Sequence, residues 1–230
     1  MYPTPQEQAV IDAAEKIMID TMARYDPSHD KHHVHRVRKT ALTIARSLPV
    51  PPDLLVVELA SLLHDVLDKK YVTPAEAEDP YTYFLPLFKS IASIHSLDLI
   101  QDGRAKLISK IVSNVSWSNE KKLRKEGLWS DWHEACLELH CVQDADRLDA
   151  IGAFGIMRCA AYSAITNRTL YVPVEDTAYP ASAVHHFHDK LLLIHDHLKT
   201  DLGRSLGEKR HKRLLDFLES LQEEYDAVIS

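Results

Sequence analysis

The sequence predicts an all-α fold, and three observations support that prediction. Apolar residues recur with helical spacing over most of the chain, whereas no run shows the sustained two-residue alternation of a half-buried strand. Helix-initiation signals are also present. In Thr4-Pro5-Gln6-Glu7 an N-cap threonine precedes a proline at the first helical position and an acid at the third. We therefore expect a bundle of helices.

The expected helices follow one another with short breaks between them. The first begins at the Thr4 signal and continues to about residue 24. A turn at Pro49-Val50-Pro51-Pro52 then separates two further helices, because prolines lack the backbone donor that a helix needs. Loops containing Asn, Gly or Pro separate the later helical patterns. After the first helix, the predicted ranges are about 33–48, 53–67, 104–115, 131–143, 149–166, 183–199 and 208–225.

The segment from residue 73 to 103 has a mixed pattern. Thr73-Pro74-Ala75-Glu76 repeats the initiation signal of the N-terminus, but Asp79-Pro80 is expected to break the segment that follows. Pro86 adds a second interruption. We expect an irregular lid or short helices in this region.

Composition indicates one globular domain. Apolar residues make up 45% of the 230 residues, and glycines are few. The chain contains no flexible linker, no repeat and no low-complexity tract. We expect a single domain over residues 1–230, with its main helical core over about 25–165 and C-terminal helices over about 183–227.

The net charge and the absence of targeting signals limit which partners and which cellular location we expect. The formal net charge of −7 argues against a nucleic-acid polymer as partner and leaves small anionic substrates open. The N-terminus has no secretory signal, and Glu58 interrupts the best apolar stretch at residues 54–63. We expect a cytoplasmic protein that binds no membrane. The cysteines lack CxxC spacing and are expected to be buried thiols: Cys136, Cys141 and Cys159.

The pair His64-Asp65 is the most informative motif, because it stands where the periodicity requires a buried apolar helix. Burying two bare polar side chains would cost several kcal/mol. Pairing or metal coordination removes that penalty, and further metal-ligand types occur upstream at His33 and downstream at Asp146. Imidazole and carboxylate ligands suit a hard or borderline divalent ion such as Mn, Fe, Co, Mg or Zn.

The acidic run from Asp144 to Asp149 supports this interpretation. At helical spacing Asp146 and Asp149 share one face, while Asp144 and Arg147 share another. One aspartate is expected to ligate, and its neighbours are expected to orient the ligands. The alternative is an acidic helix start, where carboxylates are favoured by the helix dipole.

These motifs together resemble the HD superfamily of metal-dependent phosphohydrolases, whose signature is H…HD…D on a helical bundle. The longer pattern resembles a compact subfamily of nucleotide pyrophosphohydrolase-like proteins. Five segments carry the resemblance: His29-Asp30-x-x-His33-Val34-x-Arg36-Val37, Leu62-Leu63-His64-Asp65-x-x-Asp68, Gln143 to Ile156, Phe187-x-x-Lys190-Leu191-Leu192, and Lys199-Thr200 with Gly203-Arg204.

The resemblance implies a role for each matching residue. The implied metal ligands are His33, His64, Asp65 and Asp146. It makes Asp68 the residue that positions or activates water, with Arg36 also in the catalytic group, and it leaves His32 and His35 without a ligand role. Supporting residues around the ligands are Asp144, Arg147 and Asp149. Lys31 and the segment 73–103 depart from the subfamily pattern, which leaves the substrate preference open.

Four further residues are candidates for binding substrate. Asn114 and Ser116 stand near a helix end and either contact phosphate or ribose or form an ordinary cap. Lys190 and Arg204 either bind phosphate oxygens or belong to solvated helix faces, and the resemblance favours Lys190.

The predicted reaction is metal-dependent hydrolysis of a phosphate bond in a small phosphorylated substrate, with Mn as the preferred ion. The resemblance implies that this substrate is a nucleotide, namely a nucleoside or deoxynucleoside triphosphate that is cut to the monophosphate and pyrophosphate. Three alternatives stay open, namely a 5′-nucleotidase, a non-catalytic nucleotide-binding protein and a di-iron oxygenase. The helical face at residues 160–166 serves either a homodimer or an internal core.

Overall fold

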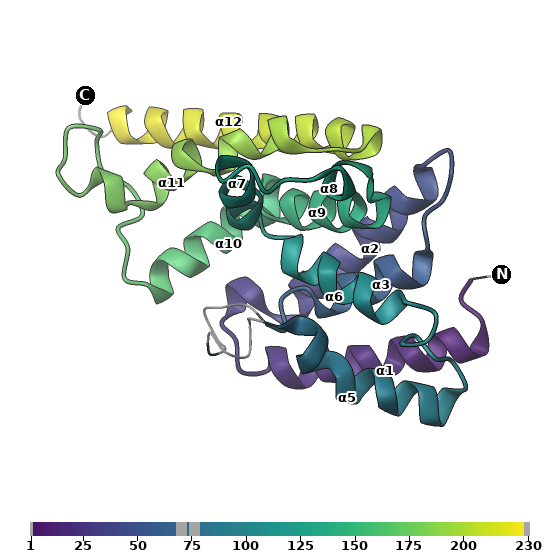
Figure 1. The fold of residues 1–230 in the computed structure, drawn as a ribbon. Helices are drawn as coiled ribbons and strands as arrows, with labels where there is room; N and C mark the ends of the chain where they lie inside the picture. Colours follow the sequence, from purple (N-terminus) through teal and green to yellow (C-terminus); the bar gives the residue numbers. More distant parts are fainter. Residues whose placement is uncertain (1, 68–72, 74–78, 228–230) are drawn as a thin grey trace. The chain divides into compact units, whose positions relative to one another are not determined.

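The structure is a computed structural model, and it describes residues 2–67, 73 and 79–227. Within these residues it contains helices and no strand, which confirms the predicted all-α class (Figure 1). The α-helices are α1 (Pro5–Met22), α2 (Lys31–Ser47), α3 (Leu54–Leu63), α5 (Pro80–His95), α6 (Arg104–Asn114), α7 (Trp117–Lys125), α8 (Asp131–Ala135), α9 (Leu137–Asp149), α10 (Gly152–Ile165), α11 (Ala183–Asp189) and α12 (Asp201–Ala227). Short 3-10 helices are η1 (Pro27–His29), η2 (Tyr179–Ala181) and η3 (Leu191–His197).

The chain divides into two compact units. The first unit contains residues 1–25 and 29–145, and the second contains residues 26–28 and 146–230. The division falls inside helix α9, so Asp146 follows Ala145, the last residue of the first unit, within one continuous helix. The organisation as a single domain stays a prediction.

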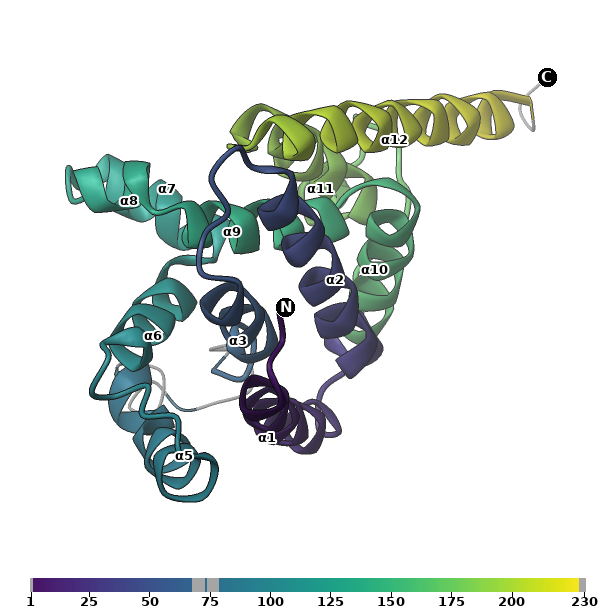
Figure 2. The same ribbon diagram turned by 90° about the vertical axis from the view of Figure 1, so that its right-hand side faces the viewer.

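Helix α3 forms the centre of the first unit. Asp53 caps its N-terminus by accepting hydrogen bonds from the backbone amides of Leu55 and Val56, and every residue from Leu55 to Leu63 is buried. Helices α1, α2 and α6 pack against α3, and α5 packs against α1 and α6 (Figures 1 and 2). A helix that is apolar on all sides requires such neighbours, and this packing holds the end of α3 in a defined position.

Glu58, the acid that interrupts the apolar stretch, lies inside this core. Its carboxylate is paired with the Arg38 guanidinium, whose Nε donates a hydrogen bond of 2.6 Å, and also accepts from the Tyr2 hydroxyl. Arg38 donates a further bond of 3.0 Å to Glu15. Burial and the neighbouring Glu58 carboxylate raise the pKa of Tyr2. A buried charge is tolerated only when it is paired, and Arg38 supplies this pairing for Glu58. Since the three charged residues come from α1, α2 and α3, the network also joins these helices.

The second unit is built around α12. Helix α10 and η3 pack against α12, and α11 packs against η3. Gly207 allows the close approach of η3, since an added Cβ at this position would lie 2.2 Å from the Cδ1 atom of Leu198.

Helix α5 corrects the expectation of an irregular segment, because residues 80–95 form one continuous helix. Asp79 caps this helix by accepting a hydrogen bond from the Thr82 amide, and Pro80 begins it. Pro86 lies on the exposed face, while Phe84 and Phe88 are buried on the other. Tertiary packing of the aromatic face therefore outweighs the local effect of the proline. The predicted signal at 73–76 lies outside the described residues apart from Thr73.

Other boundaries differ in the second half of the chain. Helix α9 extends through Asp149, so the acidic run closes a helix, and the interpretation as a helix start is wrong. The predicted helix at 183–199 is split at Lys190 into α11 and η3, α12 begins earlier than expected, and α7 was not predicted. Short helices stabilised by packing carry too little periodicity to be recognised in sequence.

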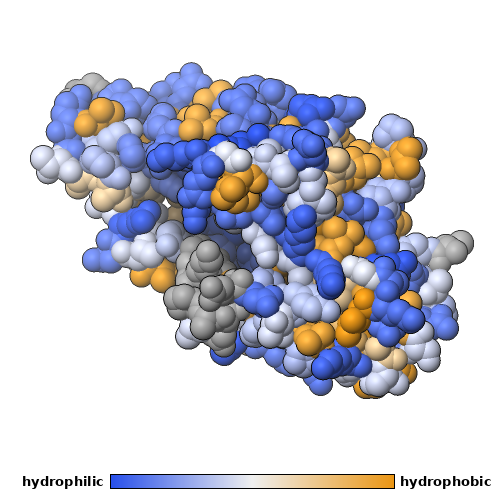
Figure 3. Space-filling model, in the orientation of Figure 1, coloured by the Kyte–Doolittle hydropathy of each residue, from blue (hydrophilic) through white to orange (hydrophobic). Residues whose placement is uncertain are grey.

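Hydrophilic residues cover most of the molecular face in Figure 3, and apolar residues form small separate groups on it. Among the described helices, none is by itself both long and apolar enough to cross a membrane. Taken together, α9 and α10 reach that length and hydropathy, but with a 68° bend between them.

Candidate metal site

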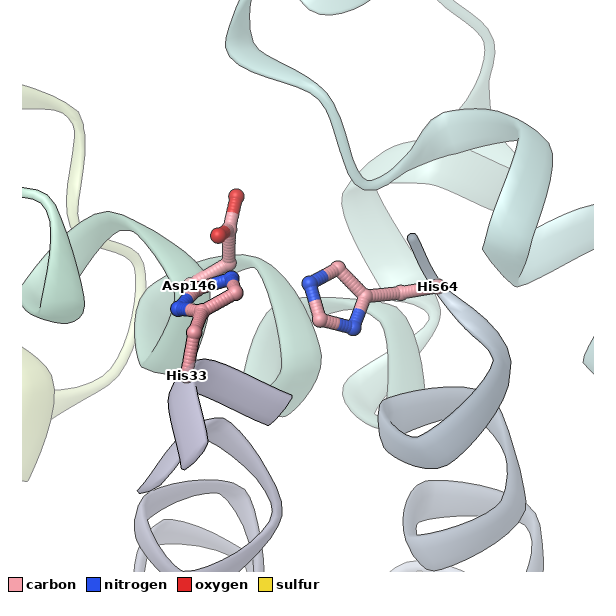
Figure 4. Close-up of side chains that lie close together, drawn as sticks. All are labelled: His33, His64 and Asp146. Atoms are coloured by element: carbon pink, nitrogen blue, oxygen red, sulfur yellow. The ribbon is translucent and has the colours of Figure 1, made fainter. Parts of the chain in front are cut away.

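Three candidate ligands from three separate segments converge. The ligand atoms of His33, His64 and Asp146 all lie within 4.8 Å of one another. Figure 4 shows both imidazole rings and the carboxylate directed toward the same region, His33 from α2, His64 from the end of α3 and Asp146 from α9. Together with Asp65, these residues are called the candidate metal site below.

The first turn of α2 positions His33. Asp30 is the N-cap of this helix, and its carboxylate accepts a hydrogen bond of 2.9 Å from the His33 backbone amide. The helical spacing then places Val34 and Val37 in the core, and the His33 side chain is buried with them. An ordinary N-cap thus sets both the start of the helix and the direction of this imidazole.

His64 is held by the last turn of α3. Its Nδ1 atom lies 2.8 Å from the carbonyl oxygen of Ser61, a distance at which Nδ1–H donates to the carbonyl. This tautomer leaves the lone pair on Nε2. A backbone carbonyl that orients a ligating histidine in this manner is common at metal sites.

Asp65 lies next to both imidazoles. Its Oδ2 atom is 3.3 Å from Nε2 of His33 and 3.4 Å from Nε2 of His64. Burial raises the pKa of Asp65, but the charges and hydrogen bonds of His64 and His33 act in the opposite direction and hold this pKa well below its usual range. The carboxylate is therefore ionised at neutral pH, as a metal ligand must be.

The donor set fits a divalent ion. Two imidazole nitrogens and two carboxylates combine the ligand types that Mn, Fe, Co and Zn accept, and they lack the thiolates of a structural zinc site. Asp146 is half-buried, and the two histidines are buried. The ligand atoms of His33, His64 and Asp146 are close enough together to hold one ion, and the ligand roles themselves stay a prediction.

The neighbouring histidines have different environments. His32 is exposed, one position before the buried His33. His35 is half-buried, and its Nδ1 atom lies 3.6 Å from the Glu15 carboxylate. Burial lowers the pKa of His35 and outweighs the opposite effect of Glu15. Neither residue belongs to the converging group.

Of the two predicted catalytic residues, the structure describes only Arg36. Asp68 lies outside the described residues. Arg36 is half-buried on α2, one turn after His33, so it lies on the same side of the helix as that residue.

The three predicted supporting residues are buried on α9. Asp144 is fully buried. Arg147 donates a hydrogen bond of 2.8 Å to the carbonyl oxygen of His197, and Asp149 pairs with Arg158 at 3.2 Å. In the second unit, these contacts tie the end of α9 to η3 and α10.

The predicted substrate-binding residues make local contacts. Asn114 accepts a hydrogen bond of 3.2 Å from Asn119, whereas Ser116 caps α7 through the Asn119 amide. In the second unit, Arg204 donates to the carbonyl oxygens of Leu198 and Lys199. Lys190 is half-buried at the junction of α11 and η3. Their roles toward a substrate stay predictions.

Sequence reasoning missed a buried polar contact in α9, one turn before Asp146. Gln143 donates hydrogen bonds of 2.7 Å to the carbonyl oxygen of Asn114 and 3.3 Å to Glu120. Gln143 and Glu120 are both buried. The glutamine at 143 was visible as part of the acidic motif, but only the fold brings α7 beside it.

Comparison with known proteins places these features in a family. No family model matches the chain. The Bacillus subtilis protein YpgQ is 33% identical over 200 residues, which cover 87% of this chain and 86% of YpgQ. A crystal structure of YpgQ in complex with ADP has a TM-score of 0.67 at 27% identity, covering 95% of this chain and 96% of that one.

A second solved structure carries the superfamily assignment. A crystal structure of an HD-superfamily hydrolase from Bacillus thuringiensis has a TM-score of 0.69 and 26% identity, and the match covers 96% of this chain and 99% of that one. The sequence match to YpgQ and this structural match each cover most of both chains. The chain belongs to the HD superfamily of metal-dependent phosphohydrolases.

Proposed function

We propose that this protein hydrolyses nucleoside triphosphates, including the deoxy forms, to the monophosphate and pyrophosphate in the presence of Mn. The observation that carries the proposal is the convergence of His33, His64 and Asp146 within 4.8 Å, with Asp65 against both imidazoles. Such a donor set matches one divalent ion of the kind that phosphoryl chemistry uses.

A divalent ion bound there would polarise a phosphate oxygen and lower the pKa of a water molecule. The residues around the ion would orient the ligands, contribute charge and activate the water molecule. The Ser61 carbonyl holds His64 in the tautomer whose Nε2 is an electron-pair donor. Asp65 contributes negative charge, because its pKa is far below neutral. We assign Asp68 to orienting or deprotonating the attacking water and Arg36 to balancing charge on the phosphate.

The nucleotide part of the proposal has a separate basis. YpgQ, which is similar to this chain over most of its length, has been crystallised with ADP. An adenine nucleotide combines a phosphate chain with a base and a ribose, and polar side chains can contact each part. We assign Lys190 and Arg204 to phosphate oxygens, and Asn114 and Ser116 to phosphate or ribose.

The test is a product assay on metal-stripped protein. The protein is resupplied with Mn, Mg, Co, Fe or Zn and given nucleoside mono-, di- and triphosphates, and orthophosphate and pyrophosphate are measured separately. Asp65→Ala removes one candidate ligand, while His32→Ala changes an exposed residue next to the site and serves as the matched control. We expect pyrophosphate from triphosphates, lost in Asp65→Ala and retained in His32→Ala.

Other product patterns would contradict the proposal in distinguishable ways. Orthophosphate from monophosphates would indicate a 5′-nucleotidase at the same site. Binding of nucleotide without any product would indicate a binding protein. Equal loss of activity in Asp65→Ala and His32→Ala would contradict the ligand assignment.

A further inference from the structure

The second unit contains a cavity that the candidate metal site does not use. It has a volume of about 550 Å³ and lies between residues 171–175 and the C-terminal half of α12, and its lining residues all belong to the second unit. Small-molecule sites in proteins have volumes of roughly 300–1,000 Å³. This cavity is therefore large enough for a small organic ligand.

Tyrosine rings form part of its wall. Tyr171, Tyr179 and Tyr225 all line the cavity. The rings of Tyr171 and Tyr225 have centroids 4.9 Å apart and are inclined by 49°. The Tyr171 hydroxyl donates a hydrogen bond of 3.0 Å to Gln222, which fixes that ring on α12. Aromatic faces carry negative charge density and attract cations.

Carboxylates supply the charge in the lining. Glu175, Glu219 and Asp226 line the cavity together with His188, and among the described residues that line it none is lysine or arginine. Burial, the neighbouring Tyr225 hydroxyl and the carboxylates of Asp226 and Glu175 raise the pKa of Tyr171. The wall also has apolar surface, from Val184 and Leu218 among others. The lining is complementary to a positively charged ligand with an apolar body.

The spacing of the carboxylates selects an elongated ligand. Glu219 and Asp226 are two turns apart on α12, which corresponds to roughly 10 Å along the helix axis. Glu175 comes from the facing segment. A compact ammonium ion can reach only one end of such a row, whereas a linear chain with several ammonium groups can reach both ends.

We propose that this cavity binds a linear aliphatic polyamine. Its ammonium groups pair with Glu175, Glu219 and Asp226, and its methylene segments lie against the tyrosine rings and the apolar wall. This ligand is independent of the proposed nucleotide hydrolysis. Polyamine binding is therefore measured in the absence of nucleotide, because nucleotides would themselves bind the polyamine.

The experiment is calorimetric titration of the full chain with spermidine at constant ionic strength. We expect saturable binding to one site. The double variant Glu219→Gln/Asp226→Asn should weaken binding about tenfold, because two ion pairs at exposed carboxylates are removed. The matched control is Glu223→Gln/Glu224→Gln, which removes the same charge from exposed positions of α12 outside the lining. We expect this control to bind as the original protein does.

A second pair of variants tests the aromatic wall. Tyr225→Leu removes a ring and should weaken binding, whereas Tyr225→Phe keeps the ring at the same position and should retain it. Circular dichroism and thermal unfolding of each variant verify that the fold is intact. Absence of saturable binding to the original protein at millimolar spermidine would overturn the proposal. Equal loss in the two double variants would overturn it as non-specific attraction, and choline binding as tightly as spermidine would overturn the elongated ligand.

Discussion

The Nδ1 atom of His64 lies 2.8 Å from the carbonyl oxygen of Ser61, one turn earlier in the chain. This contact directs Nε2 of His64 toward the region where His33 and Asp146 converge. The last turn of α3 itself supplies an acceptor that orients the imidazole. A buried apolar helix thus ends in an imidazole that is already oriented toward this region.

Replacing His33 by alanine should abolish tight metal binding. The variant loses one of two buried imidazoles, and we expect the affinity for Mn to fall at least about 100-fold. Calorimetric titration of metal-stripped protein measures this affinity directly. His32→Ala is the control, since His32 is exposed. A comparable loss in His32→Ala would show that His33 is not the ligand.

The ionised Asp65 should stabilise the metal-free fold in a pH-dependent manner. Its pKa in the folded state is depressed by His64 and His33, which outweigh the opposing effect of burial. The stabilisation is therefore present above its unfolded pKa of about 3.9 and is lost as the pH falls through the folded value. We expect Asp65→Asn to have a lower free energy of unfolding than the original protein at pH 7. Denaturant titrations should show the difference shrinking below about pH 4; a difference that does not depend on pH would contradict this origin.

Breaking the buried Glu58–Arg38 pair should destabilise the first unit. Glu58→Gln leaves the half-buried Arg38 guanidinium with Glu15 as its remaining charged partner, and we expect a loss of about 1–3 kcal/mol in the free energy of unfolding. The double variant Glu58→Leu/Arg38→Met removes both charges and should lose less. Urea unfolding of Glu58→Leu, Arg38→Met and the double variant gives the coupling energy of the pair. Purely additive losses would show that the ion pair contributes nothing specific.

The three cysteines should react with alkylating reagents only after unfolding. Burial raises the pKa of Cys136 to about 11 and that of Cys141 to about 12, and it also raises the pKa of Cys159. The reactive thiolate is therefore scarce at pH 8. Intact-mass spectrometry after iodoacetamide treatment should show no adduct on the native protein and three on the denatured protein. Rapid labelling of the native protein would contradict the buried placement.

Pro86→Ala should stabilise helix α5. The alanine restores the backbone donor that proline lacks, on the exposed face of the helix. The loss of proline's restriction on the unfolded chain offsets part of this gain, so we expect a net stabilisation of about 1–2 kcal/mol. Thermal and urea unfolding measure the effect. Destabilisation would indicate that packing of α5 depends on the backbone geometry that Pro86 imposes.

The sequence by itself determined the helical class and most long helices, because helical periodicity and caps act over a few neighbouring residues. Thr4 and Asp53 illustrate this, since each caps a helix through amides at most three positions away. The motif His64-Asp65 also stood out locally, as polar residues in an apolar helix. The family resemblance rested on such short motifs.

Only the tertiary structure decided how distant residues meet. Helix α5 persists through Pro86 because its aromatic face packs in the core, and Glu58 is tolerated because Arg38 comes from another helix. The convergence of His33, His64 and Asp146 likewise joins residues from three helices that are far apart in the chain. Contacts between residues far apart in the chain arise from burial of whole helix faces, and a local pattern carries no information on which faces will meet.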